Sequence, residues 1–211
     1  MRCTGVILAG GGATRFDGQP KGLERVGGAR IIDRVALALA AASDSLLLIA
    51  NDPLAGGWLP GVPIGSDVRL DAGALGGIHA ALVRSSTPVL LVAWDMPFVP
   101  GELLRTLRSI GEAGADVALP ASASRRGVEP LCGYYSPACI APIERALDRG
   151  ERHIVSFFGD VRVATLPLAT VERFGEPARV FLNVNTPSEL ALAERHASTP
   201  DAGDRRPGAP R

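Results

Sequence analysis

The 211-residue chain predicts an α/β protein of three layers, in which a mainly parallel β-sheet is covered by helices on both faces. Two observations lead to this prediction. Short runs rich in leucine and β-branched residues alternate along the chain with longer runs rich in alanine and leucine. The short runs are almost uninterrupted in their apolar character, which is typical of strands that are buried on both faces of a parallel sheet.

The expected elements follow in chain order. Strands are expected at residues 4–8, 46–50, 88–92, 117–119, 131–135, 162–166 and 180–183. Helices are expected at residues 31–42, 77–84, 101–113, 137–148 and 187–196. The stretch 120–135 is less regular and allows an antiparallel hairpin.

The last helix has the clearest start. Thr186, Pro187 and Glu189 supply an N-cap side chain, a proline in the first turn and an acid at the third helical position. Residues 1–196 are therefore expected to form one domain. Residues 197–211 are rich in Pro, Gly, Asp and Arg and bury almost nothing, so a disordered tail is expected there.

Composition limits the classes of partner. Lys and Arg number 22 and Asp and Glu number 22, so no overall field attracts nucleic acid or an acidic membrane. No apolar run approaches the roughly 20 residues of a membrane span, and no secretory signal is visible. The three cysteines, Cys3, Cys132 and Cys139, lack metal-ligand spacing, which favours reduced thiols. We expect a cytoplasmic protein that holds any anion at a local site.

The most informative stretch is LAGGGATRFDGQPKGL, residues 8–23, which directly follows an apolar run. A strand that ends in glycines leaves clustered backbone N–H groups and no Cβ to block close approach, which suits an anion. An ordinary flexible turn remains the alternative. The P-loop pattern fails because Lys21 is followed by Gly22 and Leu23, and the dinucleotide fingerprint fails because Arg15 stands at its last glycine.

Arg15 and Lys21 follow the glycines on the same loop. Two cations beside a nest of backbone N–H groups can neutralise a triphosphate and offset the charge that develops on departing pyrophosphate. The loop offers few other functional groups. The sequence therefore favours a phosphate site over a pair of solvated surface charges.

The whole stretch resembles the signature LAGGxxxRxGxxK of the molybdenum cofactor guanylyltransferases. Further similar motifs follow in the same order up to residue 196: GALGGI at 73–78, DMPF at 95–98, EPL at 129–131, GERHI at 150–154 and NVNTP at 183–187. The chain also departs from the pattern. Ala74 stands where relatives often carry proline, and Gln19-Pro20 replaces the commoner acid before the lysine.

The resemblance implies a Rossmann-like three-layer nucleotidyltransferase fold and a set of site residues. It places the triphosphate of GTP against Leu8, Ala9, Gly10, Gly11, Gly12 and Lys21, with Arg15 assisting. It also implies Mg²⁺ as the metal and the molybdopterin-bound molybdenum cofactor as the second substrate.

Asp95 lies just past the carboxyl end of an apolar strand, where open α/β sheets bind their ligands. Its carboxylate is suited to a magnesium ion that bridges phosphate oxygens, because hard cations take oxygen ligands. A simple turn or cap role before Pro97 is the alternative. The resemblance implies the metal role, so Lys21, Arg15 and Asp95 are the expected catalytic residues.

Four other residues are expected at the site through the resemblance. Asn183 and Asn185 alternate at the end of the last expected strand, which would place them on one side, and in similar transferases this motif lies near metal and phosphates. Asp67 matches an acid of the guanine site, where a carboxylate accepts from N1–H and N2–H₂ together. Asn51 ends the second expected strand, near a polar nucleotide contact of the family.

The resulting hypothesis is transfer of GMP from GTP to the molybdenum cofactor, with release of pyrophosphate. A cytidylyltransferase is the nearest alternative, but such enzymes carry alanine where Gly10 stands here, and the smaller residue leaves room for a purine. A sugar-phosphate nucleotidyltransferase and a non-catalytic GTP- or cofactor-binding delivery protein are further alternatives. Transient contact with molybdenum cofactor insertion proteins or molybdoenzymes is also implied. No general base is expected from His79 or His153, since a phosphate nucleophile is already ionised.

Overall fold

The structure is a computed structural model that describes residues 1–10 and 20–198. Within these residues a seven-stranded sheet has the order β5-β4-β1-β6-β8-β7-β9. The strands are β1 (Thr4–Ala9), β4 (Ser45–Ala50), β5 (Ile64–Gly65), β6 (Val89–Ala93), β7 (Val117–Pro120), β8 (Cys132–Tyr135) and β9 (Val163–Leu166).

The sheet is mainly parallel, as expected. β1 pairs in parallel with both β4 and β6, so that Ile7 lies beside Leu48 on one side and Val92 on the other. β8 runs antiparallel to both β6 and β7, and a further antiparallel bridge joins Ala121 to Val128. The hairpin that the sequence allowed at residues 120–135 is therefore present as β7, a loop and β8.

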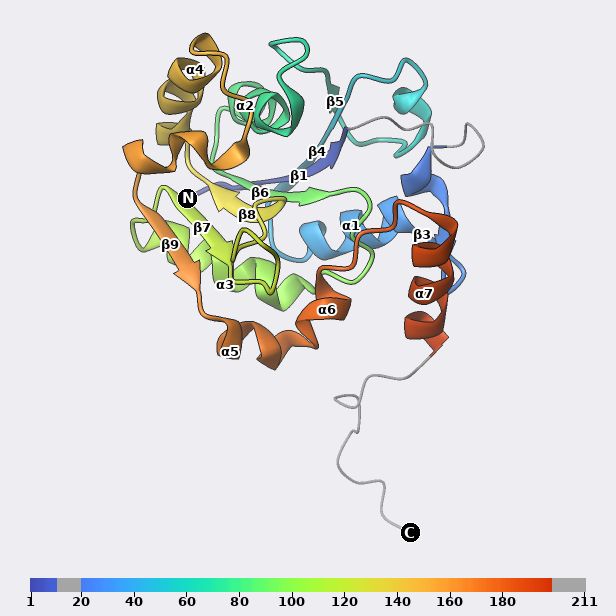
Figure 1. The fold of residues 1–211 in the computed structure, drawn as a ribbon. Coiled ribbons are helices and arrows are strands. Elements are labelled where there is room, and N and C mark those ends of the chain that lie inside the picture. The colour runs from blue at the N-terminus through green and yellow to red at the C-terminus, as the bar shows by residue number, and fades with distance from the viewer. Residues whose placement is uncertain (11–19, 199–211) are drawn as a thin grey trace.

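Helices cover both faces of the sheet (Figure 1). On one face α1 (Ile31–Ala40) and α3 (Gly101–Glu112) pack against Ile7, Leu90 and Val92. On the other face α2 (Gly73–Ser85) and α4 (Ile140–Asp148) pack with the alternate strand residues, among them Val6, Leu8 and Leu91. This alternation follows from strand geometry, because successive side chains point to opposite faces. Each face has its own buried cluster, and the three-layer prediction is confirmed.

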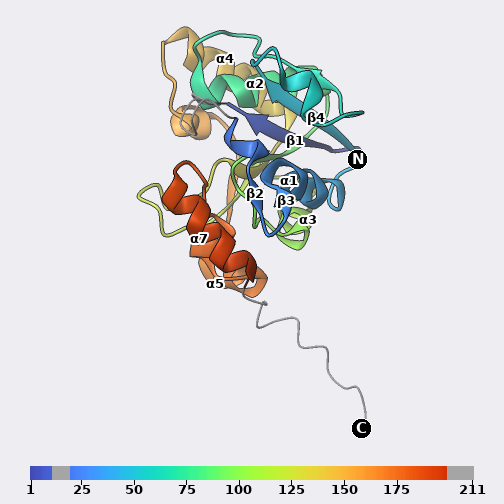
Figure 2. The same ribbon diagram turned by 90° about the vertical axis from the view of Figure 1, so that its right-hand side faces the viewer.

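The carboxyl-terminal part completes the first of these faces. It contains α5 (Leu168–Val171), α6 (Pro177–Val180) and α7 (Pro187–Ser198). Figure 2 shows α7 beside the small hairpin of β2 (Arg25–Val26) and β3 (Ala29–Arg30). The hairpin turn is Gly27-Gly28, with φ of 59° and 80°, which glycine adopts without steric cost. The backbone N–H of Gly27 donates to Glu194 of α7 at 3.1 Å.

One element was wrongly predicted. Residues 180–183 form no strand; Val180 ends the short helix α6, which has proline in its first turn, and irregular backbone follows. Val180, Phe181 and Val184 are buried in the hydrophobic cluster below the sheet rather than in it. Their apolar run reflects burial alone, and burial does not distinguish a strand from a packed loop.

Other boundaries shift by a few residues. α2 begins at Gly73 rather than residue 77, α4 is preceded by a 3₁₀ turn at Pro137–Cys139, and α7 extends to Ser198, two residues into the expected tail. The N-cap of α7 is confirmed, since the backbone N–H of Glu189 donates to Thr186 Oγ1 at 3.2 Å. Residues 199–211, the rest of the expected tail, lie outside the described residues. No helix of the described residues is long and apolar enough to cross a membrane.

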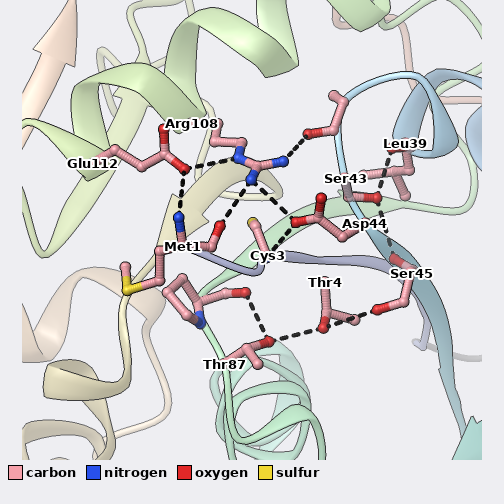
Figure 3. A network of polar contacts seen from close by, with 12 residues as sticks. Met1, Cys3, Thr4, Leu39, Ser43, Asp44, Ser45, Thr87, Arg108 and Glu112 are labelled. Carbon is pink, nitrogen blue, oxygen red and sulfur yellow. Dashed lines mark hydrogen bonds and ion pairs between the residues drawn. The ribbon is translucent and has the colours of Figure 1, made fainter.

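At the amino ends of the parallel strands a polar network ties the start of the chain to its neighbours (Figure 3). The Arg108 guanidinium donates to Met1 O at 2.8 Å and to Asp44 Oδ2 at 3.0 Å, and it pairs with Glu112 at 3.0 Å. The same Asp44 oxygen accepts from the backbone N–H of Cys3 at 2.8 Å, and these donors hold the pKa of Asp44 below its usual range. This network stabilises the edge of the sheet opposite the one described next.

Candidate active site

A cavity of about 380 Å³ opens at the carboxyl edge of the sheet. The ends of β1, β4 and β6 meet there because parallel strands present the same edge. Its lining comprises Leu8, Ala9, Gly10, Lys21, Ile49, Ala50, Asn51, Asp67, Asp71, Gly73, Ala74, Gly77, Ala93, Trp94, Asp95 and Leu131. Seven of these were expected from the sequence: Leu8, Ala9, Gly10, Lys21, Asn51, Asp67 and Asp95.

Lys21 connects two distant segments within this site. Its Nζ donates to Asp95 Oδ2 at 2.5 Å and to Asn185 Oδ1 at 2.6 Å. The side chains of Lys21 and Asp95 are only 13% and 8% exposed, so the pair is shielded from bulk water. The attraction between the ammonium and the carboxylate is therefore only slightly screened by solvent.

Asp95 is held by its backbone and keeps one oxygen unpaired. Its carbonyl accepts from the backbone N–H of Val184 at 2.9 Å, which fixes the segment after β6 against the segment before α7. Its side-chain Oδ1 is buried and has no hydrogen-bond partner within the structure described. A buried carboxylate oxygen without a partner is costly, and a ligand or metal that bonds to it removes that cost.

A second acid lies close enough to Asp95 to be affected by its charge. The pKa of Glu129 lies above its usual range, chiefly because the side chain is buried. The negative charge of Asp95 raises this pKa further, whereas the hydrogen bond from the backbone N–H of Leu131 opposes the rise. Leu131 in turn pairs its carbonyl with the backbone N–H of Ala93 at 2.9 Å. The EPL motif at 129–131 thus lies beside the carboxyl end of β6.

Asn51 and Asp67, which both line the cavity, are joined to each other by two hydrogen bonds. Asn51 Nδ2 donates to Asp67 Oδ2 and the backbone N–H of Asp67 donates to Asn51 Oδ1, both at 2.8 Å. Both ends of the Asn51 amide are therefore engaged by Asp67. The amide fixes the orientation of the carboxylate, which lines the cavity.

The start of α2 forms part of the wall and was not among the expected site residues. Asp71 and Gly73 have φ of 56° and 61°, so the chain makes a left-handed turn into the helix. A Cβ on Gly77 would collide with Leu8, so the glycine lets this helix lie close against β1. The motif GALGGI, with glycines at the start of a helix after a strained turn, is the sequence signal that indicates this role.

Trp94 forms another part of the wall that sequence reasoning missed. Its ring is 2% exposed and stacks on Trp58 with centroids 4.9 Å apart. Gly22 also lies close to the ring, since its Cβ, if present, would lie 2.7 Å from Cδ2 and 3.0 Å from Cζ3 of the indole. The short turn that carries Lys21, at Lys21–Leu23, therefore rests directly on the Trp94 ring.

The remaining expected residues are Asn183, Asn185, Gly11, Gly12 and Arg15. Asn185 joins the site through Lys21, whereas Asn183 does not, because its Nδ2 donates to the carbonyl of Phe181 at 3.0 Å. The two asparagines were expected to share one side of a strand, and no strand exists there. Gly11, Gly12 and Arg15 lie outside the described residues. His79 is buried in α2, where its Nε2 lies 3.1 Å from Glu144.

One further sequence signal marks Lys21. It is the only lysine of the chain, and the other basic residues among the 22 are arginines. An ammonium is a compact charge on a flexible stem, whereas a guanidinium is a planar fork. A chain that otherwise uses arginine throughout has lysine at a position that contacts Asp95 and Asn185.

Comparisons with known proteins show the family to which the chain is similar. A family model described as "MobA-like NTP transferase domain" matches residues 5–165. A molybdenum cofactor guanylyltransferase of Desulfosudis oleivorans is 34% identical over 193 residues, covering 90% of this chain and 94% of that one. One of Ralstonia nicotianae is 37% identical over 203 residues, covering 91% and 96%.

A solved structure is similar across the same extent. The molybdopterin-guanine dinucleotide biosynthesis protein A of Archaeoglobus fulgidus matches with a TM-score of 0.77 and 28% identity, covering 92% of this chain and 98% of that one. The similarity therefore extends over most of the fold. The chain belongs to the MobA-like NTP transferases and, among them, to the molybdenum cofactor guanylyltransferases, which are nucleotidyltransferases.

Proposed function

We propose that this protein transfers GMP from GTP to the molybdopterin-bound molybdenum cofactor, forming the guanine dinucleotide cofactor and releasing pyrophosphate. The observation that carries the proposal is the contact of Lys21 with Asp95 and Asn185 beside a cavity at the carboxyl edge of the sheet. The relatives named molybdenum cofactor guanylyltransferase support the choice of both substrates.

The guanine base is assigned to the side of the cavity that holds Asp67. The carboxylate accepts from N1–H and N2–H₂ of guanine, and the hydrogen bonds from Asn51 hold it in one orientation. Gly10 supports a purine, because among the described residues a Cβ at this position would meet no atom within 4 Å, and the glycine lines the cavity.

The phosphates are assigned to the end of β1 and to Lys21. Leu8, Ala9 and Gly10 line the cavity, and Lys21 supplies a positive charge beside Asp95. Arg15, Gly11 and Gly12 remain part of the proposal through the sequence pattern alone.

Magnesium fits the donors at this site. Asp95 offers a buried oxygen without a partner, and Asn185 offers an amide oxygen beside it. Hard cations such as Mg²⁺ bind oxygen, and Mg²⁺ is commonly held by one or two carboxylates together with substrate phosphates. When bound, the ion would neutralise charge on the phosphate oxygens.

The reaction needs alignment and charge neutralisation more than proton transfer. An oxygen of the acceptor's terminal phosphate attacks the α-phosphorus of GTP, the bond from that phosphorus to the bridging oxygen breaks, and pyrophosphate leaves with the electron pair. Lys21 stabilises the negative charge that develops on the leaving group. The walls of the cavity position the two substrates in line.

The product has to leave the cavity before it can be used, so the proposal includes transient contact with molybdenum cofactor insertion proteins or molybdoenzymes. It also places the protein in the cytoplasm. Cys3, Cys132 and Cys139 are all buried and unpaired, which suits a reducing compartment.

The test is magnesium-dependent pyrophosphate release with a molybdopterin-type acceptor, measured with GTP and with CTP separately. Lys21→Ala and Asp95→Ala are each expected to lose about 100-fold or more in turnover. Asp148→Ala is the matched control, because this aspartate pairs with Arg69 on the surface and does not line the cavity. Near-normal guanylyl transfer by both active-site variants refutes the assignment, a preference for CTP makes the protein a cytidylyltransferase, and tight GTP binding without turnover makes it a delivery protein.

A further inference from the structure

We infer that Lys21 keeps divalent cations away from Asp95 in the free protein, so that the metal enters together with the nucleotide. In this view the ammonium of Lys21 occupies one carboxylate oxygen of Asp95 and the amide oxygen of Asn185, and its charge repels a metal from the other oxygen of Asp95. The ammonium leaves this position only for the phosphates. The inference rests on the proposed role of Asp95 as the metal ligand.

The first support is the geometry of the ammonium. Lys21 Nζ contacts Asp95 Oδ2 at 2.5 Å and Asn185 Oδ1 at 2.6 Å, which are two hard oxygen donors of the site. The contacting side chains of Lys21 and Asp95 are largely shielded from solvent. A divalent ion that approached the same oxygens would face a neighbouring positive charge at short range, and such repulsion is strong where water does not screen it.

The second support is the way that Lys21 is held. The turn Lys21–Leu23 packs closely against the Trp94 ring at Gly22, which has no Cβ to separate them. Two backbone bonds close the turn, from Leu23 N to Pro20 O at 2.9 Å and from Glu24 N to Lys21 O at 3.2 Å. The backbone of Lys21 is therefore fixed, while its four-carbon stem leaves the ammonium free to choose between acceptors.

The third support is that the site offers few protein ligands to a metal ion that arrives without nucleotide. Within the described residues no group of three or more His, Cys, Asp or Glu could hold a metal ion. Asp95 and Asn185 together offer fewer oxygens than the six that Mg²⁺ requires, so phosphate oxygens and water have to supply the rest. Phosphates bring these oxygens and at the same time offer Lys21 a competing acceptor with more negative charge.

The charges that line the cavity also support a role for Lys21 in keeping cations out. Asp67, Asp71 and Asp95 are lining carboxylates, and Lys21 is the cation among the lining residues that the structure describes. Removal of the Lys21 charge would leave carboxylates as the only charged side chains among the described lining residues. Such a wall attracts a cation in the absence of nucleotide.

The experiment measures binding of Mn²⁺ alone to the full chain, from the electron paramagnetic resonance signal of the free ion. Lys21→Met keeps the length of the side chain and removes its charge. We expect this variant to bind Mn²⁺ about tenfold or more tightly than the parent protein without nucleotide, which corresponds to about 1.4 kcal/mol. In Lys21→Met/Asp95→Asn the gain is expected to disappear, which shows that the ion binds at Asp95.

A second readout uses the single lysine of the chain. Labelling with ¹⁵N-lysine gives one side-chain ammonium signal, which reports on Lys21 alone. Millimolar Mg²⁺ by itself is expected to leave that signal unchanged, whereas Mg²⁺ with GTP is expected to shift it. Thermal unfolding of each variant confirms that it is folded.

Two results would overturn the inference. One is Mn²⁺ affinity in Lys21→Met no greater than in the parent protein, and the other is an ammonium signal that Mg²⁺ shifts without GTP. Both measurements are made without the molybdenum cofactor and without turnover. A failure of the proposed function appears instead as absent pyrophosphate release by the parent protein, so the two failures are distinguishable.

Discussion

Gly22→Ala tests whether the Trp94 ring positions Lys21. A Cβ at residue 22 would come closest to Cε3 of Trp94 and would lie 2.7 and 3.0 Å from Cδ2 and Cζ3, whereas ordinary contact begins at 3.4 Å. The ring cannot withdraw easily, because it is buried and stacked on Trp58. The turn of Lys21 and the indole therefore have to move apart by about 1 Å.

Two effects follow from this displacement. Overpacking of a buried contact costs about 1–3 kcal/mol, which for a chain of this length lowers the unfolding temperature by several degrees, about 5 °C. A catalytic group that moves by about 1 Å loses about 100-fold in rate. We therefore expect Gly22→Ala to lose about 100-fold in pyrophosphate release while it remains folded at 25 °C.

The assay combines turnover with intrinsic fluorescence. The chain has two tryptophans, and both belong to the stack, so a change in their emission reports directly on the Trp58–Trp94 contact. Gly159→Ala is the matched control, because a Cβ there meets no atom within 4 Å and the residue has no positive φ. Parental turnover and parental fluorescence in Gly22→Ala would refute the reasoning, since the added methyl would then be accommodated without displacement.

Three further variants test other parts of the molecule. Gly10→Ala is expected to be as stable as the parent protein and to shift the nucleotide preference from GTP toward CTP. The measurement is the ratio of the kcat/KM values for the two nucleotides, and an unchanged ratio would show that this glycine does not select the base. Asn51→Ala is expected to raise KM for GTP about tenfold with little change in kcat, because Asp67 loses the amide that orients it, and a fall in kcat alone would contradict this. Hydrogen bonds from the Arg162 guanidinium and backbone N–H lower the pKa of Asp116 in the folded protein. The carboxylate therefore stabilises the fold above its unfolded pKa of 3.8, and this stabilisation is lost as pH falls through the lower folded pKa. Asp116→Asn should therefore lower the unfolding temperature at pH 7 and lose this deficit below about pH 4; a deficit independent of pH would disprove the assignment.

The local patterns of the chain were sufficient for most of the fold. The sequence predicted the strands at residues 4–8, 46–50 and 117–119 and the start of α7 at Thr186. These predictions succeeded because propensity, hydrophobic periodicity and capping depend on only a few neighbouring residues. The expected strand at residues 180–183 failed because its apolar side chains pack below the sheet as part of a loop. The turn into α2 at Asp71 and the β2–β3 hairpin were missed, although glycines mark both.

The sequence by itself determined the chemical groups of this protein: a glycine-ended strand, one lysine after it, an aspartate after another apolar strand, and asparagines before the last helix. Tertiary structure alone decided that Lys21 meets Asp95, 74 residues away, and Asn185, 164 residues away. It also decided that Asn185 joins the site while Asn183 turns back to Phe181, and that Trp94 lies beneath Gly22. The physical reason is that local sequence specifies where strands begin and end, whereas the order of strands in the sheet specifies which ends become neighbours.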